Sequence, residues 1–239
     1  MRGKLIVIEG TDCSGKETQT RLLVDRLNRE GIRAERLAYP DYDTPTGKII
    51  GACYLGKEYL CKSELKSEKG WFLEGADNVD PLVSINFFAA DRRYNKPKID
   101  KLLDSGVNVI LDRYVGSNMA HQGGMLKTKR ERRKMFKKIE TLEYKINELN
   151  RPDAIMFLYV PYENALILKK NREESPDQLE SSSIYLKNSE RTYLELVDLY
   201  KYTKIDCVSD NIMRSIEDIN DELYDKVKLL IRHSKEYCE

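Results

Sequence analysis

The chain has 239 residues, of which 41% are hydrophobic and 34% are charged. This composition excludes global disorder and predicts one large α/β domain spanning residues 1–239. Its 41 Lys and Arg residues balance 40 Asp and Glu residues, which excludes the net basic field of a dedicated duplex-DNA binder.

Five apolar stretches have the length and composition of buried parallel strands, although the second is weaker and the last is less regular. They span Leu5–Ile8, Arg33–Tyr39, Val107–Leu111, Ala154–Val160 and Ile205–Val208. The first intervening helix is expected to place Leu22, Leu23 and Leu27 on one face and to end near Gly31. Strands that alternate with helices predict a doubly wound parallel sheet flanked by helices.

Two polar segments interrupt this alternation. Gly56–Asp80 is expected to be a surface excursion anchored by Trp71 and Phe72. Asn171–Ser183 is poor in apolar residues and lies between two helical patterns, so residues 171–183 are expected to form a lid.

The stretch Lys127–Lys138 is strongly basic, which is compatible with a nucleic-acid patch or with the solvated face of a helix. The second interpretation is favoured because helical spacing supplies a buried stripe. That stripe comprises Met135, Phe136, Ile139, Leu142 and Ile146. We therefore expect no nucleic-acid partner.

The pattern of apolar residues and cysteines indicates a soluble protein of the cytoplasm. No run approaches the roughly 18 apolar residues that a membrane helix needs, so no membrane partner is expected. The 5 cysteines are odd in number and contain no Cys-x-x-Cys pair. This usage favours a reducing compartment over a disulfide framework or a structural zinc site.

A phosphate-binding loop stands between the first strand and the first helix, the context that makes this motif specific. It comprises Gly10, Thr11, Asp12, Cys13, Ser14, Gly15, Lys16, Glu17 and Thr18. Such a loop suits a polyphosphate: its amides can converge on phosphate oxygens, the helix N-terminus adds positive potential, and Lys16 can span the β- and γ-phosphates. With the alternating strands, the loop predicts a sheet of the P-loop NTPase type.

The position after the lysine breaks the motif. Glu17 stands where a Ser or Thr hydroxyl normally binds Mg²⁺, and Thr18 follows one place late. Its carboxylate either takes the metal, directly or through water, or forms a salt bridge on the first helical turn. Both alternatives stay open, and action through water is favoured because the rest of the site is intact.

A second polar motif, Asp112-Arg113-Tyr114, ends the third strand. Parallel strands deliver their last side chains into the ligand crevice of such a sheet. Asp112 is therefore a candidate ligand of Mg²⁺, and the planar fork of Arg113 suits a phosphate. A surface ion pair is the alternative.

With these motifs the sequence resembles the thymidylate kinase family of nucleoside monophosphate kinases along nearly the whole chain. The specific part is Asp112-Arg113-Tyr114 with Ser117, Ala120 and Gln122-Gly123. Supporting motifs are Ile8–Asp12, Phe88–Arg92, Arg151-Pro152-Asp153, and Asp177 with Glu180. The resemblance implies a homodimer that transfers the γ-phosphoryl group of Mg²⁺-bound ATP to deoxythymidine monophosphate (dTMP), a deoxynucleoside monophosphate.

The resemblance also implies the roles of individual side chains. Asp12 would hold the sugar 3′-hydroxyl, Phe88 would stack on the base, and Arg92 would hydrogen-bond the base. The pocket would be lined further by Ser117, Asn118, His121 and Gln122. The expected catalytic residues are Lys16, Asp112, Arg113 and, from the lid, Arg172, with Lys169 and Lys170 as alternatives. Without the resemblance, Phe88 fits a core position better than a stacking platform.

Three departures from the family pattern keep other functions open. Tyr39–Tyr42 lacks an arginine that often contacts the acceptor phosphate, and His121 replaces a larger aromatic residue beside the sugar. Cys13 stands where the loop can carry an arginine. The alternatives are a kinase of the same fold with another deoxynucleotide or nucleoside acceptor, and, because of Glu17, a nucleotide-binding module with little catalysis.

Overall fold

The computed structural model describes residues 1–57, 60, 70–72, 74–170 and 182–236. Their central element is a five-stranded parallel sheet. Its strands are β1 (Leu5–Gly10), β2 (Ala34–Ala38), β3 (Asn108–Asp112), β4 (Ala154–Tyr159) and β5 (Thr203–Asp206). Their order is β2-β3-β1-β4-β5, so β1 is central, and Ile8 lies opposite both Asp112 and Met156. The predicted parallel sheet is confirmed.

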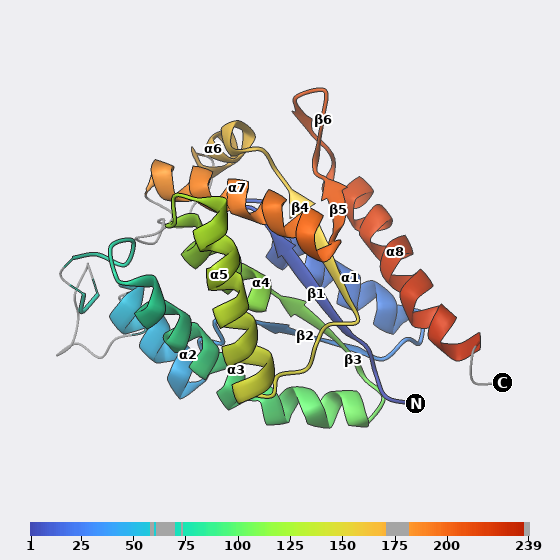
Figure 1. The fold of residues 1–239 in the computed structure, drawn as a ribbon. Coiled ribbons are helices and arrows are strands. Elements are labelled where there is room, and N and C mark those ends of the chain that lie inside the picture. The colour runs from blue at the N-terminus through green and yellow to red at the C-terminus, as the bar shows by residue number, and fades with distance from the viewer. Residues whose placement is uncertain (58–59, 61–69, 73, 171–181, 237–239) are drawn as a thin grey trace.

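Helices cover both faces of the sheet (Figure 1). The described elements are α1 (Lys16–Arg29), α2 (Pro45–Ile49), η1 (Ile50–Tyr54), α3 (Pro81–Asp104), α4 (Val115–Gly124), α5 (Lys129–Glu140), η4 (Thr141–Ile146), α6 (Tyr162–Lys170), α7 (Ser183–Tyr200) and α8 (Ile216–Glu236); η1 and η4 are π-helical. None of the helices described is long and apolar enough to cross a membrane.

The alternation of side chains along β1 explains the two helical layers. Leu5 and Val7 enter a core formed with α3, α4, α5 and α7. Ile6 and Ile8 enter the opposite core, against α1 and α8. A strand buried on both faces carries a continuous apolar run, which is why the sequence pattern located it.

Two details of the predicted elements are wrong. The fifth strand was expected over Ile205–Val208, but β5 ends at Asp206, because Val208 pairs with Met213 in the β6 (Val208–Ser209) and β7 (Ile212–Met213) hairpin. On α1, Leu23 is buried as expected, whereas Leu22 is 36% exposed.

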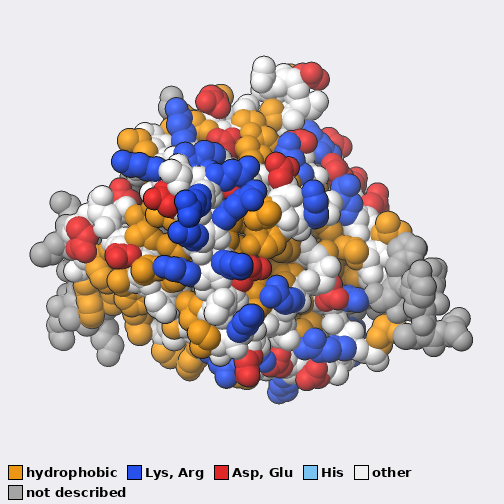
Figure 2. Space-filling model, viewed as in Figure 1, with side chains coloured by type: hydrophobic (Ala, Val, Ile, Leu, Met, Phe, Trp, Pro, Cys, Tyr) orange, Lys and Arg blue, Asp and Glu red, His pale blue; other side chains and the backbone are white. Residues whose placement is uncertain are grey.

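The basic stretch forms α5, whose N-terminus is closed by a capping box between Thr128 and Glu131. Lys and Arg side chains gather over the middle of the face that α5 occupies (Figure 2). Arg132 was expected on the solvated face of this helix, but it is buried, and its Nε lies 2.8 Å from Glu195 Oε2. Ile146 departs from the expected buried stripe, because the η4 turn leaves it 67% exposed.

The two aromatic residues expected to anchor the polar segment before α3 differ in burial. Phe72 packs against Tyr54 with ring centroids 5.8 Å apart, whereas Trp71 is 54% exposed. Residues 58–59, 61–69 and 73 of this segment lie outside the described residues, as do residues 171–181 of the expected lid.

Candidate active site

A cavity of about 630 Å³ opens where β1, β2 and β3 end, at the edge of the sheet where ligands of this fold class bind. We call its two parts the loop end and the helix end. The loop end comprises residues 12–18, Arg36, Asp112 and Arg113; the helix end comprises Phe88, Arg92, Ser117, Asn118, His121 and Gln122. The cavity thus brings together the predicted site residues, except Gly10 and Thr11, which do not line it, and Arg172, which lies outside the described residues.

The phosphate-binding loop is anchored to the sheet by its own residues. Thr11 Oγ1 donates to the Val160 carbonyl oxygen at 2.8 Å and accepts from the Val160 N–H at 3.0 Å. Gly10 has no room for a side chain, since a Cβ there would lie 2.5 Å from Ser14 Oγ. Gly15, the N-cap of α1, has a φ of 72°, in the left-handed region that favours glycine. These constraints place the positive N-terminus of α1 at the cavity.

The side chain of Lys16 folds back over this loop. Its Nζ donates to the carbonyl oxygens of Gly10 at 3.1 Å and Thr11 at 2.8 Å, and to Ser14 Oγ at 3.2 Å. Burial lowers the pKa of Lys16 to about 8, and the nearby charge of Arg113 adds to this effect. The ammonium therefore rests on neutral acceptors, which an anionic ligand can replace.

Two ion pairs cross the loop end. Arg113 Nη2 lies 3.2 Å from Asp12 Oδ1, and Arg36 Nη2 lies 2.7 Å from Asp112 Oδ2. Burial acts to raise the pKa of Asp12, but nearby positive charges, led by Arg113, outweigh it and lower that pKa below its ordinary value. Each carboxylate at this end is thus compensated by an arginine.

Arg36 is a site residue that sequence reasoning missed. It lies on β2, where it also donates from Nε to Thr20 Oγ1 at 2.7 Å. The strand was expected, and the alternation of side chains along a strand carried the only signal: Ala34, Arg36 and Ala38 share one face, and Arg36 and Ala38 line the cavity.

Glu17 lies on the exposed first turn of α1. Its carboxylate is 2.6 Å from Arg21 Nη2, and both side chains are about 65% exposed. Among the residues that the structure describes, no three His, Cys, Asp or Glu side chains form a group able to hold a metal ion. Asp112 is one of the carboxylates that line the loop end, which fits Mg²⁺ that is held mainly by phosphate oxygens and water.

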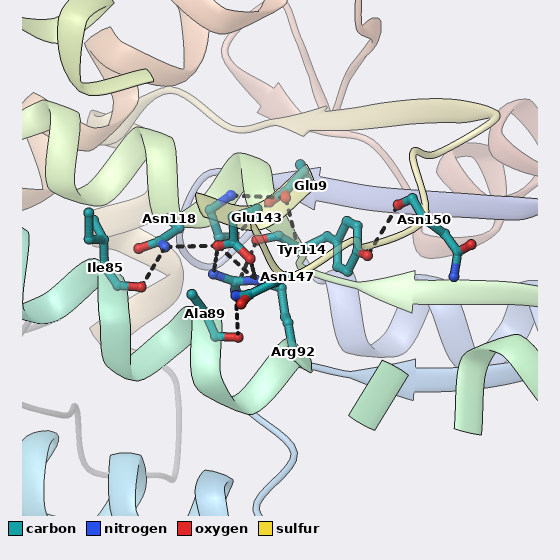
Figure 3. A network of polar contacts seen from close by, with 10 residues as sticks. Glu9, Ile85, Ala89, Arg92, Tyr114, Asn118, Glu143, Asn147 and Asn150 are labelled. Carbon is teal, nitrogen blue, oxygen red and sulfur yellow. Dashed lines mark hydrogen bonds and ion pairs between the residues drawn. The ribbon is translucent and has the colours of Figure 1, made fainter. Parts of the chain in front are cut away.

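A buried network fixes the helix end (Figure 3). Arg92, on α3, forms an ion pair with Glu143, on η4, and the two side chains are 3% and 0% exposed. Burial opposes the charge on Arg92, but the Glu143 carboxylate more than offsets it and raises the pKa of Arg92. Asn118 Nδ2 donates to the same carboxylate at 3.1 Å. Glu143 had no sequence signal, since it lies in an ordinary charged helical stretch.

A second buried carboxylate, Glu9 of β1, organises the start of α4. It accepts from the backbone N–H groups of Tyr114 at 3.0 Å and Ser117 at 2.9 Å. The hydroxyl groups of Ser117 and Tyr193 lie 2.6 and 3.0 Å from its other oxygen. Ser117, expected to face a ligand, is therefore engaged by Glu9 in this structure.

The remaining predicted residues form the walls of the helix end. Phe88 packs edge-on against Tyr54, with ring centroids 5.6 Å apart, while also lining the cavity, so packing against the core and access to the cavity coexist. His121 stacks on Tyr185, with centroids 5.5 Å apart. Burial lowers the pKa of His121 to about 4, so the imidazole is neutral near pH 7. Gln122 Oε1 is buried with no hydrogen-bond partner among the described residues.

Two features bear on the positive charges that are absent from residues 39–42 and from Cys13 of the loop. Tyr42, which stands in place of the expected arginine, lines the cavity and lies under Lys57, whose Nζ is 5.5 Å from the ring centroid. Of the expected lid cations, Lys169 lines a second, smaller pocket together with residues 11–13 of the loop. The side chain of Lys170 and all of Arg172 lie outside what the structure describes.

Comparisons with known proteins agree with these observations. The family model for thymidylate kinase matches residues 8–67 and 70–222. A thymidylate kinase of Schizosaccharomyces pombe is 30% identical over 231 residues, 95% of this chain and 92% of that protein. One from Danio rerio is 26% identical over 98% of this chain and 94% of its own length. A solved structure of the Candida albicans enzyme shares the fold, with a TM-score of 0.68 and 24% identity, covering 95% of this chain and 92% of that one.

Proposed function

The chain belongs to the thymidylate kinase family, and on this basis we propose that it transfers the γ-phosphoryl group of ATP to dTMP, giving ADP and the diphosphate dTDP. The observation that carries the proposal is the continuity of one cavity from the phosphate-binding loop to the helix end. A donor polyphosphate and an acceptor nucleotide can therefore meet within it.

The loop end provides the charge for the transfer. Lys16 would leave its carbonyl partners for the β- and γ-phosphates, and Arg113 would leave Asp12 for the acceptor phosphate. An oxygen of that phosphate attacks the γ-phosphorus. The bond between the γ-phosphorus and the oxygen that bridges the β- and γ-phosphates breaks, and ADP leaves. Catalysis then consists of positioning and electrostatic stabilisation, without a covalent intermediate.

Mg²⁺, when bound, supplies neutralisation of the donor phosphates. Asp112 would be its carboxylate ligand, exchanging its pair with Arg36 for the metal. The guanidinium of Arg36, once released, would supply the contact to the acceptor phosphate that Tyr42 cannot make. Glu17 would act on the metal through water after leaving Arg21.

The helix end would bind the nucleoside. The exposed face of Phe88 would stack on the base, Arg92 and Asn118 would hydrogen-bond its edge, and Asp12 would hold the 3′-hydroxyl. His121 would lie beside the sugar and allow a modest preference for deoxyribose. We further assign residues 1–239 to one kinase domain with a lid over residues 171–183 that brings Arg172 to the phosphates, and propose a cytoplasmic homodimer.

A single assay tests the activity. Purified protein with ATP and Mg²⁺ is offered dTMP, deoxycytidine monophosphate (dCMP), deoxyguanosine monophosphate and thymidine, and products are separated by anion exchange. The expected result is equimolar ADP and dTDP, with the highest kcat/KM for dTMP. Comparable kcat/KM for the three monophosphates would indicate a broad-specificity kinase. ATP binding without product would indicate a binding module.

A further inference from the structure

The amide of Asn118 has a fixed orientation. Its Nδ2 donates to Glu143 Oε1 at 3.1 Å and to the carbonyl oxygen of Ile85 at 3.2 Å (Figure 3). Both partners only accept, because the Glu143 carboxylate forms an ion pair with Arg92 and a carbonyl carries no proton. Turning the amide over would place its oxygen against two other oxygens. The hydrogen-bond network therefore assigns the nitrogen to the Glu143 side.

The oxygen of the same amide is left without a partner. Asn118 is 3% exposed and lines the cavity, and its Oδ1 is buried with no hydrogen bond to any described residue. Gln122, one helical turn further along α4, carries a second buried acceptor of this kind. Buried polar atoms in native structures are normally satisfied. Two such acceptors on one helix face indicate that a ligand donates there.

A donor and an acceptor thus stand side by side at the helix end. Arg92 lines the cavity as the donor group, and Asn118 presents only an acceptor. A base edge with a carbonyl next to a ring N–H, as in thymine and uracil, complements this pair. Cytosine carries an amine next to an unprotonated ring nitrogen, so both positions would face a group of the same kind.

Glu143 accepts hydrogen bonds from both members of this pair without lining the cavity itself. It lies in the π-helical η4, and such turns often occur at functional sites. We propose that Glu143 is the positioning residue for base selectivity: it holds Asn118 so that only an amide oxygen meets the base, and thereby selects a base with a ring N–H. This inference rests on the proposed function.

The variant Glu143→Gln tests the proposal with little change in shape. A glutamine amide can donate to Asn118 Oδ1, which leaves the Ile85 carbonyl as the one acceptor of the two that favours the original orientation. Asn118 can then turn over more readily and offer its NH₂ group to the base. We expect the ratio of kcat/KM for deoxyuridine monophosphate (dUMP) to that for dCMP to fall at least about tenfold. Dissociation constants of dUMP and dCMP from calorimetry should move the same way without any turnover.

A matched control separates positioning from stability. Glu195→Gln breaks the Arg132–Glu195 pair, whose side chains are 8% and 9% exposed and which does not line the cavity. It should lower thermal stability as Glu143→Gln does but leave the dUMP to dCMP ratio unchanged. If Glu143 acts through Asn118, Glu143→Gln should have no further effect on that ratio in an Asn118→Leu background.

Several outcomes would overturn the proposal. One is an unchanged ratio in a folded Glu143→Gln protein with normal ATP affinity, and another is equal affinity of the wild type for dUMP and dCMP. If Glu143→Gln does not fold, Asn118→Leu alone must abolish the preference. Failure of the wild type to make dTDP while it still prefers dUMP over dCMP in calorimetry would refute the proposed reaction and leave the base selectivity standing.

Discussion

The two ends of the cavity hold their charges in different ways. At the loop end, the side chains of the Arg36–Asp112 and Arg113–Asp12 pairs are between 10% and 26% exposed. At the helix end, the Arg92–Glu143 pair is 3% and 0% exposed. A partly solvated pair separates at low cost, whereas removing one partner of a buried pair leaves an uncompensated charge.

This difference fits the roles proposed for the two ends, with phosphates bound at the loop end and a base at the helix end. Phosphates enter and leave with every turnover, so cations at the loop end need partners that they can exchange. A base presents the same neutral pattern of hydrogen bonds each time, so the helix end gains from groups that do not move. The loop end is therefore expected to govern rate and phosphate affinity, and the helix end to govern selectivity.

The largest expected effect comes from removing the charge of Lys16. Lys16→Ala should lower kcat on the order of a hundredfold or more, because the ammonium stabilises charge that develops in the transition state. Turnover from a coupled ADP assay gives the value, and circular dichroism checks the fold. The hydrogen bonds that the side chain makes to described residues stay within its own loop, so near-normal turnover in a folded variant would refute the kinase mechanism.

A smaller effect is expected for Arg36, which belongs to the exchangeable end. Arg36→Met should raise the KM for dTMP by about tenfold, the worth of one charge-assisted hydrogen bond, with ATP affinity nearly unchanged. Arg36→Lys should recover part of the loss. Arg33→Met, which removes an exposed arginine bonded to the Ser105 carbonyl, is the control. An unchanged KM for dTMP would remove Arg36 from the acceptor site.

The sequence located one end of the cavity better than the other. The loop and the end of β3 are local motifs whose spacing follows from a strand, a turn and a helix, so Lys16 and Asp112 could be placed without tertiary information. The partners of these residues come from elsewhere in the chain. Arg36 pairs with Asp112 across 76 positions of sequence, and Glu143 pairs with Arg92 across 51 positions. Nothing in the local sequence distinguishes Arg36 or Glu143 from a surface charge.

Proton uptake offers a subtler probe of the loop end. Because the pKa of Lys16 is about 8, its ammonium loses its proton as pH rises through 8, whereas an unfolded lysine keeps it to about 10.5. This group therefore makes the free energy of unfolding rise with pH between those values. Bound phosphates favour the ammonium, so ATP binding near pH 9 should take up about one proton, and near pH 7 almost none.

Calorimetry of ATP binding in buffers with different ionisation enthalpies measures this uptake. Lys16→Met should abolish it, while Glu143→Gln, at the helix end, should leave it intact. Equal proton uptake by the wild type and Lys16→Met would assign the titration to another group.

The smallest effect is expected at Glu17, on the rim of the loop end. Its ion pair with Arg21 is exposed and joins positions i and i+4 of α1, so Glu17→Ala should change the free energy of unfolding by less than about 0.5 kcal/mol.

A role on Mg²⁺ through water requires the Glu17 carboxylate to leave Arg21. Glu17→Ala should then raise the Mg²⁺ concentration for half-maximal rate by about twofold, since the metal keeps its phosphate and water ligands. Glu17→Ser should restore part of the difference through its hydroxyl, and Arg21→Ala, which frees the carboxylate, should not raise the requirement. Superimposable Mg²⁺ titrations of the wild type, Glu17→Ala and Glu17→Ser would reduce Glu17 to a surface charge and leave Asp112 as the carboxylate for the metal at the loop end.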